Sequence, residues 1–150
     1  MKVHSQTDVG LVRTLNEDAC RTGLLGENGA WAVVCDGMGG ANGGEIASET
    51  AVKSIEEQIL ASYEEDFKSE EMKLMLSTLI FHANSAVYDM AQENESLKGM
   101  GTTIVVAIVL DNVAHIAHAG DSRAYWLHNG NIMQITTDHS MVQELIKNGD

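Results

Sequence analysis

The sequence of 150 residues contains no proline, only two cysteines and few aromatic residues, which make up 5% of the chain. Without proline, the turns depend on glycine, asparagine and aspartate. Cys20 and Cys35 occur in neither a CxxC nor a zinc-type spacing, so we expect both to be reduced and simply packed.

Basic residues are scarce, with 9 lysines and arginines against 22 acidic residues and a formal charge of −13. A nucleic-acid backbone and an anionic membrane both repel negative charge, so neither is expected as a partner. The apolar runs are no longer than strands, and the start of the chain lacks the apolar stretch of a signal peptide. We therefore expect a cytoplasmic protein without a membrane span.

Hydrophobic residues make up 44% of the chain, which is enough to build a core. The length suits one domain, and without a repeat or linker we predict that residues 1–150 form one structural unit. The periodicity of apolar residues predicts helices over residues 45–62, 69–94 and 139–148. It predicts strands over residues 2–9, 18–25, 30–35, 102–110, 113–119, 123–127 and 131–136.

Turn and cap residues support this division of the chain. Asp111-Asn112 and Asn129-Gly130 predict two-residue hairpin turns, and Ser69 is expected to cap the helix that begins there. The strands at 30–35 and 102–110 are apolar on both faces, which indicates sheets covered by other layers. The order of strands, helices and then an antiparallel meander predicts an α+β fold, such as a β-sandwich with helices outside.

The most informative segment is residues 36–40, Asp-Gly-Met-Gly-Gly, which follows the apolar strand at 30–35. A carboxylate at the mouth of a buried strand is costly unless a positive group meets it. The Asp36 carboxylate beside a Gly37 carbonyl is a hard-oxygen environment that suits Mg²⁺ or Mn²⁺ better than zinc. The alternative is a tight strand-to-helix turn in which Asp36 is a capping residue.

A phosphate-binding glycine loop is the rival interpretation of the same segment. The spacing matches neither G-x-G-x-x-G nor G-x-x-x-x-G-K-[ST], and no lysine or arginine lies in the loop. Asp36 at its mouth would repel phosphate unless a cation intervened, so we favour the metal site.

Two further segments place charged groups at the ends of strands. Arg13 lies close in sequence to Glu17 and Asp18. The planar guanidinium of an arginine matches the geometry of phosphate oxygens, and the two carboxylates could hold metal-bound waters. The alternative is a surface ion-pair cluster. Asp121, in the segment Gly-Asp-Ser-Arg at 120–123, follows another apolar strand, and a hairpin turn is the alternative there. Residues 101–103 are interpreted mainly as packing.

His115 and His118 are three residues apart on a predicted strand. Successive side chains of a strand alternate between its faces, so these two point to opposite faces and cannot form one metal site. We interpret them as core or interface histidines.

Taken in order, these motifs resemble those of the metal-dependent protein Ser/Thr phosphatases of type 2C, in particular the short bacterial members. The resemblance covers essentially the whole chain. It implies a four-layer α/β/β/α sandwich of two antiparallel sheets flanked by helices, incomplete here at its C-terminus. It is carried by residues 7–10, 13–18, 36–40, 44–48, 100–103, 120–125 and 137–140.

The resemblance also implies two Mg²⁺ or Mn²⁺ ions that share a bridging water. Asp36 would bridge both ions, and the Gly37 carbonyl would ligate one of them. Glu17 and Asp18 would act mainly through metal-bound water, and Asp121 would help to hold a third, weaker metal.

The implied activity is hydrolysis of phosphoserine and phosphothreonine in proteins, with Arg13 binding the substrate phosphate and no covalent phosphoenzyme. By analogy, the partners are phosphorylated proteins and the Ser/Thr kinases that act on them. Met38 and Ala41 depart from the pattern, because relatives carry histidines at these places, one of them proposed as a general acid.

The family's C-terminal part supplies further strands and two more metal-binding aspartates, one in a Ser-Asp-Gly motif and one in an Asp-Asn motif. We find neither motif after the matching segment at 137–140. We therefore expect the N-terminal part of a single phosphatase domain, inactive or very weak by itself and able to dimerise by segment swapping. The alternative functions are a non-catalytic module that binds a phosphoprotein or another protomer, and a nucleotide-binding regulator.

Overall fold

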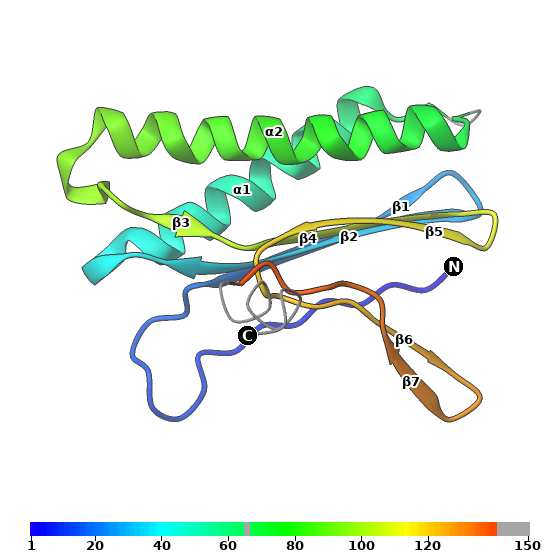
Figure 1. The fold of residues 1–150 in the computed structure, drawn as a ribbon, viewed down its shortest axis with the longest axis horizontal. Helices are drawn as coiled ribbons and strands as arrows, with labels where there is room; N and C mark the ends of the chain where they lie inside the picture. The colour runs from blue at the N-terminus through cyan, green and yellow to red at the C-terminus, as the bar shows by residue number, and fades with distance from the viewer. Residues whose placement is uncertain (65–66, 141–150) are drawn as a thin grey trace, which may run out of the picture.

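The computed structural model describes residues 1–64 and 67–140, and its centre is an antiparallel sheet of five strands (Figure 1). The long strands lie side by side in the order β1, β2, β4, β5, and the short β3 pairs with the end of β2. The strands are β1 (Asp18–Leu25), β2 (Gly29–Met38), β3 (Gly101–Thr102), β4 (Ile104–Leu110) and β5 (Val113–Ala119).

Two helices, α1 (Gly40–Ser62) and α2 (Ser69–Glu93), cover one face of this sheet, and a short 3₁₀ turn, η1 (Glu95–Leu97), follows them (Figure 1). Apolar side chains at helical spacing on both helices meet the alternate apolar side chains of the central strands. None of the helices in the described part of the chain is long and apolar enough to cross a bilayer. The core includes Ile55, Ile59, Met72, Leu79, Val33, Val106 and Ile108, all 1% exposed or less.

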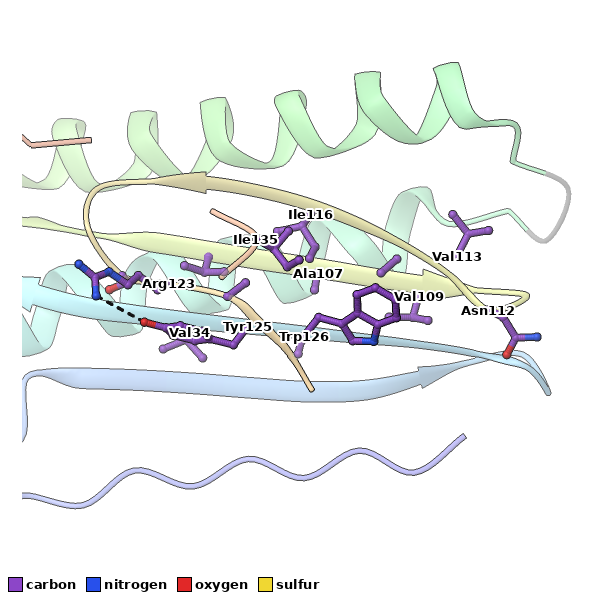
Figure 2. Close-up of a pocket in the computed structure, with 15 residues that line it drawn as sticks. Val34, Ala107, Val109, Asn112, Val113, Ile116, Arg123, Tyr125, Trp126 and Ile135 are labelled. Carbon is purple, nitrogen blue, oxygen red and sulfur yellow. Dashed lines mark hydrogen bonds between the residues drawn. The ribbon is translucent and has the colours of Figure 1, made fainter. Parts of the chain in front are cut away.

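In the part of the chain that the structure describes, the opposite face of the sheet carries no helix. There, β6 (Tyr125–His128) and β7 (Asn131–Gln134) form a separate two-stranded antiparallel sheet, and the N-terminal segment runs along the same side (Figure 1). An apolar groove of about 930 Å³ separates the large sheet from the segment around β6 (Figure 2). Its walls include Val34, Val109 and Trp126, and Trp126 is 55% exposed.

The α+β fold with two antiparallel sheets is confirmed. The hairpin turns are confirmed as well, because Asp111, Asn112 and Asn129 adopt the positive φ angles of 47°, 66° and 49° that such turns require. The predicted strand at 18–25 and the strand at 113–119 agree with β1 and β5 to the residue.

Three predicted boundaries near the glycine-rich segment were wrong. The strand predicted to end before Asp36 continues to Met38, because Gly37 and Met38 pair with Thr102 and Gly101 of β3. The first helix begins at Gly40 and not at residue 45, so part of the expected glycine loop is helical. The strand predicted over 102–110 is interrupted at residue 103, between β3 and β4.

Other predictions failed at the edges of the fold. Residues 2–9 form no strand in the described structure, are exposed and belong to neither sheet. The N-cap of α2 is Lys68 and not Ser69, and the Lys68 N–H donates to a Glu71 carboxylate oxygen at 2.7 Å. Residues 139–140 are not helical, and the remainder of the helix predicted over 139–148 lies outside the described residues. The strands predicted over 123–127 and 131–136 correspond to the shorter β6 and β7.

The two cysteines are free thiols in different environments, and we expect them to react at different rates. Cys35 is fully buried in the hydrophobic core, and burial raises the pKa of its thiol to about 12. Because the thiolate is the reactive species, iodoacetamide should label Cys20 in the native protein and Cys35 only after unfolding. Peptide mass spectrometry measures both sites, with Cys20→Ser as the control. Equal labelling of both thiols in the folded protein would contradict the burial of Cys35.

Candidate functional site

Two segments that are distant in the sequence meet where β1 begins and β2 ends. Asp18, the first residue of β1, is the cross-strand partner of Asp36 on β2. The Gly37 N–H donates to the Glu17 carbonyl oxygen at 3.1 Å, which continues the contact by one residue. The antiparallel register therefore brings together the carboxylates that the sequence singled out in two separate motifs.

The Asp36 carboxyl lies in a field of like charge. Partial burial raises the pKa of Asp36 above its ordinary value, and the neighbouring charges of Asp18 and Asp121 raise it further. Arg13 acts in the opposite direction and lowers the pKa. Acidic groups from two other parts of the chain thus act on the Asp36 carboxyl, and its ionised form is costly until a cation offsets the repulsion.

Two threonines hold the backbone of Asp36 by hydrogen bonds. Thr102 is the last residue of β3, and Thr103 follows it. The Asp36 N–H donates to the Thr103 hydroxyl oxygen at 3.0 Å, and the Thr103 N–H donates to the Asp36 carbonyl oxygen at 2.9 Å. The Thr102 hydroxyl donates to the same carbonyl oxygen at 3.0 Å. These bonds fix the direction in which the Asp36 side chain leaves the strand.

Gly37 and Gly44 allow three backbone segments to meet without intervening side chains. A Cβ atom at Gly37 would lie 2.6 Å from the Glu17 carbonyl oxygen and closer still to the Gly44 carbonyl oxygen. A Cβ atom at Gly44 would collide with the Glu17 carboxylate. The start of α1 therefore packs directly on the end of β2, beside Glu17, in a place that only glycine can occupy.

Arg13 and Glu17 form an ion pair at the entrance to β1. The Arg13 guanidinium donates to a Glu17 carboxylate oxygen at 3.2 Å, and the Arg13 side chain is 68% exposed. An exposed pair of this kind contributes little to stability. Its effect is positional, because the guanidinium is kept near the Asp36 carboxyl while it remains accessible from solvent.

Asp121 reaches the site from the loop that follows β5. The Gly120 carbonyl oxygen accepts a hydrogen bond from the His139 N–H at 2.9 Å, and the Ser122 hydroxyl lies 2.6 Å from the Thr103 hydroxyl. Asp121 itself is exposed. The loop is thus hydrogen-bonded on one side to Thr103, between β3 and β4, and on the other to His139.

The loop and the end of β5 are also joined to the segment that follows β7, the loop by an ion pair and β5 by a histidine pair. The Arg123 guanidinium donates to both carboxylate oxygens of Asp138, at 2.8 and 2.6 Å. His118 hydrogen-bonds the Thr137 carbonyl oxygen at 2.8 Å, and its ring stacks on that of His139 with centroids 4.3 Å apart. His118 is half-buried in this contact, consistent with its interpretation as an interface histidine.

The donor atoms at this site are of the kind that hard divalent cations bind. Carboxylate oxygens of Asp18, Asp36 and Asp121 and the backbone carbonyls around Gly37 are the donors that Mg²⁺ and Mn²⁺ prefer. Within residues 1–64 and 67–140, however, no three histidine, cysteine, aspartate or glutamate side chains form a group that could hold a metal ion by themselves.

Two residues of this site were missed by the reasoning from sequence. Thr103 was assigned to packing and Ser122 to a hairpin turn, yet their hydroxyls join the Asp36 strand to the Asp121 loop. The available signal was a polar side chain at position 103, directly before the buried run of β4. A buried hydroxyl requires a hydrogen-bond partner, and the sequence does not say which one.

The sequence of the chain is similar to those of known proteins. A sequence profile described as protein phosphatase 2C matches residues 12–146. The serine/threonine phosphatase stp of Listeria welshimeri is 36% identical over 153 residues, which cover 100% of this chain and 59% of that protein. The serine/threonine protein phosphatase PstP of Mycobacterium tuberculosis is 32% identical over 149 residues, which cover 99% of this chain and 27% of that protein.

The chain is also similar to solved structures of bacterial serine/threonine phosphatases. The serine/threonine phosphatase Stp1 from Staphylococcus aureus superposes with a TM-score of 0.86 at 39% identity, covering 96% of this chain and 56% of that one. The catalytic domain of PstP in complex with two manganese ions superposes with a TM-score of 0.77 at 33% identity, covering 96% of this chain and 58% of that one. This chain therefore spans less than two thirds of the stp and Stp1 chains that it matches.

Proposed function

Because the chain belongs to the protein phosphatase 2C family, we propose that it forms part of an enzyme that hydrolyses phosphoserine and phosphothreonine in proteins. The observation that carries this proposal is that the charges of Asp18, Asp121 and Arg13 all act on the Asp36 carboxyl. A phosphate ester is doubly charged, so acidic residues at its binding site require cations between protein and substrate.

We propose that Asp36 binds both of two metal ions and that the Gly37 carbonyl oxygen binds one of them. Glu17 and Asp18 would hold water molecules of the metals, and Asp121 would help to bind a third ion. Manganese is supported by the solved PstP complex, and the donor set suits magnesium equally well. When bound, the metal ions supply activation of the attacking water and neutralise charge on the phosphoryl oxygens.

The residues of this chain would position the substrate. The Arg13 guanidinium can bind two phosphoryl oxygens with its planar fork, and its present partner Glu17 keeps it close to the metal ligands. The three hydrogen bonds to the Asp36 backbone hold that carboxylate in place during the reaction. Met38, which is 63% exposed, carries no proton for the leaving group, so the general acid is a different group.

The proposed substrates are cytoplasmic phosphoproteins, and the opposing enzymes are the Ser/Thr kinases that phosphorylate them. The printed names of the relatives from Listeria and Mycobacterium, both serine/threonine phosphatases, support this substrate class. The negative charge of the chain, −13, favours peptides with basic residues near the phosphate.

The test is hydrolysis of a phosphothreonine peptide by two proteins. One is the chain of 150 residues alone, and the other joins it to the part of Staphylococcus aureus Stp1 outside the superposed region. The joined protein should release phosphate with Mn²⁺ and stop in EDTA, whereas the chain alone should reach at most about a tenth of that rate, because it supplies only some of the metal ligands. Stp1 is the positive control. A joined protein that folds, binds Mn²⁺ and releases no phosphate would contradict the proposed activity.

A further inference from the structure

Thr103 lies at the interruption between β3 and β4, where its backbone and side chain both contact Asp36. It is 9% exposed, and its hydroxyl oxygen accepts the Asp36 N–H at 3.0 Å. Its own N–H donates to the Asp36 carbonyl oxygen at 2.9 Å. The backbone bond continues the register in which Gly37 lies opposite Thr102 and Val34 opposite Val105. The bond to the hydroxyl is different, because a side chain accepts the Asp36 N–H there.

The same side chain contacts the loop that carries Asp121. The Thr103 and Ser122 hydroxyl oxygens are 2.6 Å apart, which is the distance of a good O–H···O hydrogen bond. On the other side of Asp121, a Cβ atom at Gly120 would lie 2.7 Å from the Thr103 methyl carbon. One threonine thus contacts the residues on both sides of Asp121 and the backbone of Asp36.

We propose that Thr103 is a positioning residue, whose hydroxyl, through Ser122, fixes the Asp36 and Asp121 carboxylates relative to each other for binding divalent cations. This inference rests on the proposed function, since it concerns the metal ligands of that same site. Thr103 does not contact the cation in this proposal. It acts only through the strand and the loop that it joins.

The chemistry of threonine explains why both parts of the side chain are used. The hydroxyl can accept from the Asp36 N–H and donate to Ser122 at the same time. Valine has nearly the same shape but neither function, and it would leave the Asp36 N–H without its partner in a buried position. Serine keeps the hydroxyl and loses only the methyl contact with Gly120. The pair of substitutions therefore separates positioning by hydrogen bonds from packing.

The experiment titrates Mn²⁺ into ¹⁵N-labelled chain and follows paramagnetic broadening of the Asp36 and Asp121 amide signals, which detects weak binding. Thr103→Val should weaken Mn²⁺ affinity about 10- to 100-fold, the usual effect of losing a group that orients metal ligands. Thr103→Ser should keep most of the affinity. Ser122→Ala should lie between them, because it keeps the bond from Thr103 to Asp36 and loses the link to the Asp121 loop.

Two controls separate positioning from a general loss of structure. Thr22→Val makes the same chemical change on β1, away from Asp36, and should leave the affinity unchanged. Hydrogen exchange of the Asp36 amide, measured without metal, should become faster in Thr103→Val and stay protected in Thr103→Ser. Urea unfolding of each variant shows whether the remaining structure is intact.

The outcomes distinguish this inference from the proposed function. The positioning role would be contradicted if Thr103→Val kept its Mn²⁺ affinity near Asp36, or if Thr103→Val and Thr103→Ser lost affinity equally. Neither result would contradict the metal site itself. The absence of any broadening near Asp36 and Asp121 in the unsubstituted chain would overturn the metal site, and the positioning role with it. Loss of Mn²⁺ affinity in Thr103→Val but not in Thr103→Ser supports both the positioning role and the metal site.

Discussion

Asp36→Asn is expected to weaken Mn²⁺ binding by at least about 100-fold, since even residues that only orient metal ligands contribute up to that factor. Asparagine keeps the size of the side chain and its place on β2, but it removes the negative charge that faces the cation. It also replaces one of the two carboxylate oxygens by an NH₂ group, which cannot bind a cation. The effect of the substitution is therefore electrostatic and not steric.

The same substitution should stabilise the chain when metal is absent. Burial, together with the charges of Asp18 and Asp121, raises the pKa of Asp36, so its ionised form costs free energy in the folded state. With a raised pKa, this cost is fully present above the folded value and disappears below the ordinary carboxyl pKa of about 4. Asp36→Asn should thus raise the free energy of unfolding at neutral pH, and the gain should vanish in acid.

Two measurements on the same samples check these opposite effects. Calorimetric titration gives the Mn²⁺ affinity, and urea unfolding in EDTA gives the stability at neutral and acidic pH. Asp89→Asn on α2 is the matched control, because Asp89 is exposed on the outer side of the helical layer and should change neither quantity. If Asp36→Asn lowered stability in EDTA, Asp36 would be a structural cap, as the alternative interpretation of its motif holds.

The sequence was informative wherever a local rule determines the conformation. The hairpin turn at Asp111-Asn112 could be predicted because these residue types tolerate positive φ angles, and β1 and β5 could be predicted from their apolar patterns. The strand predicted over residues 2–9 failed for a different reason. An alternating pattern shows that a segment could pair, but it does not name a partner strand, and this segment pairs with no strand of the two sheets.

The members of the site could be selected from sequence, but their arrangement could not. Asp36 was recognised because a carboxylate directly after a buried strand requires a partner. Its pairing with Asp18 depends on the register between β1 and β2, which a loop of turn residues sets and the motifs do not encode. Thr103 was missed because its role depends on two contacts, Asp36 and Ser122, that are distant in the sequence.

Gly37→Ala is expected to lower the free energy of unfolding by at least about 2 kcal/mol, in the upper range for overpacking a tight site. The new methyl group would collide with the Gly44 carbonyl oxygen and lie 2.6 Å from the Glu17 carbonyl oxygen. Both obstacles are backbone atoms, so no side-chain rotation relieves the collision. The start of α1 must move away from β2.

A neighbouring glycine provides the matched control for this substitution. Gly101 lies on β3, opposite Met38, and a Cβ atom there would meet only the flexible end of the Met38 side chain at 3.2 Å. Gly101→Ala should therefore remain within about 1 kcal/mol of the unsubstituted chain, because the lower entropy of its unfolded state offsets the contact. Urea unfolding followed by circular dichroism measures both variants. Equal stabilities would mean that β2 and α1 are not in direct contact at Gly37, and the proposed metal site would lose the close backbone approach on which its geometry depends.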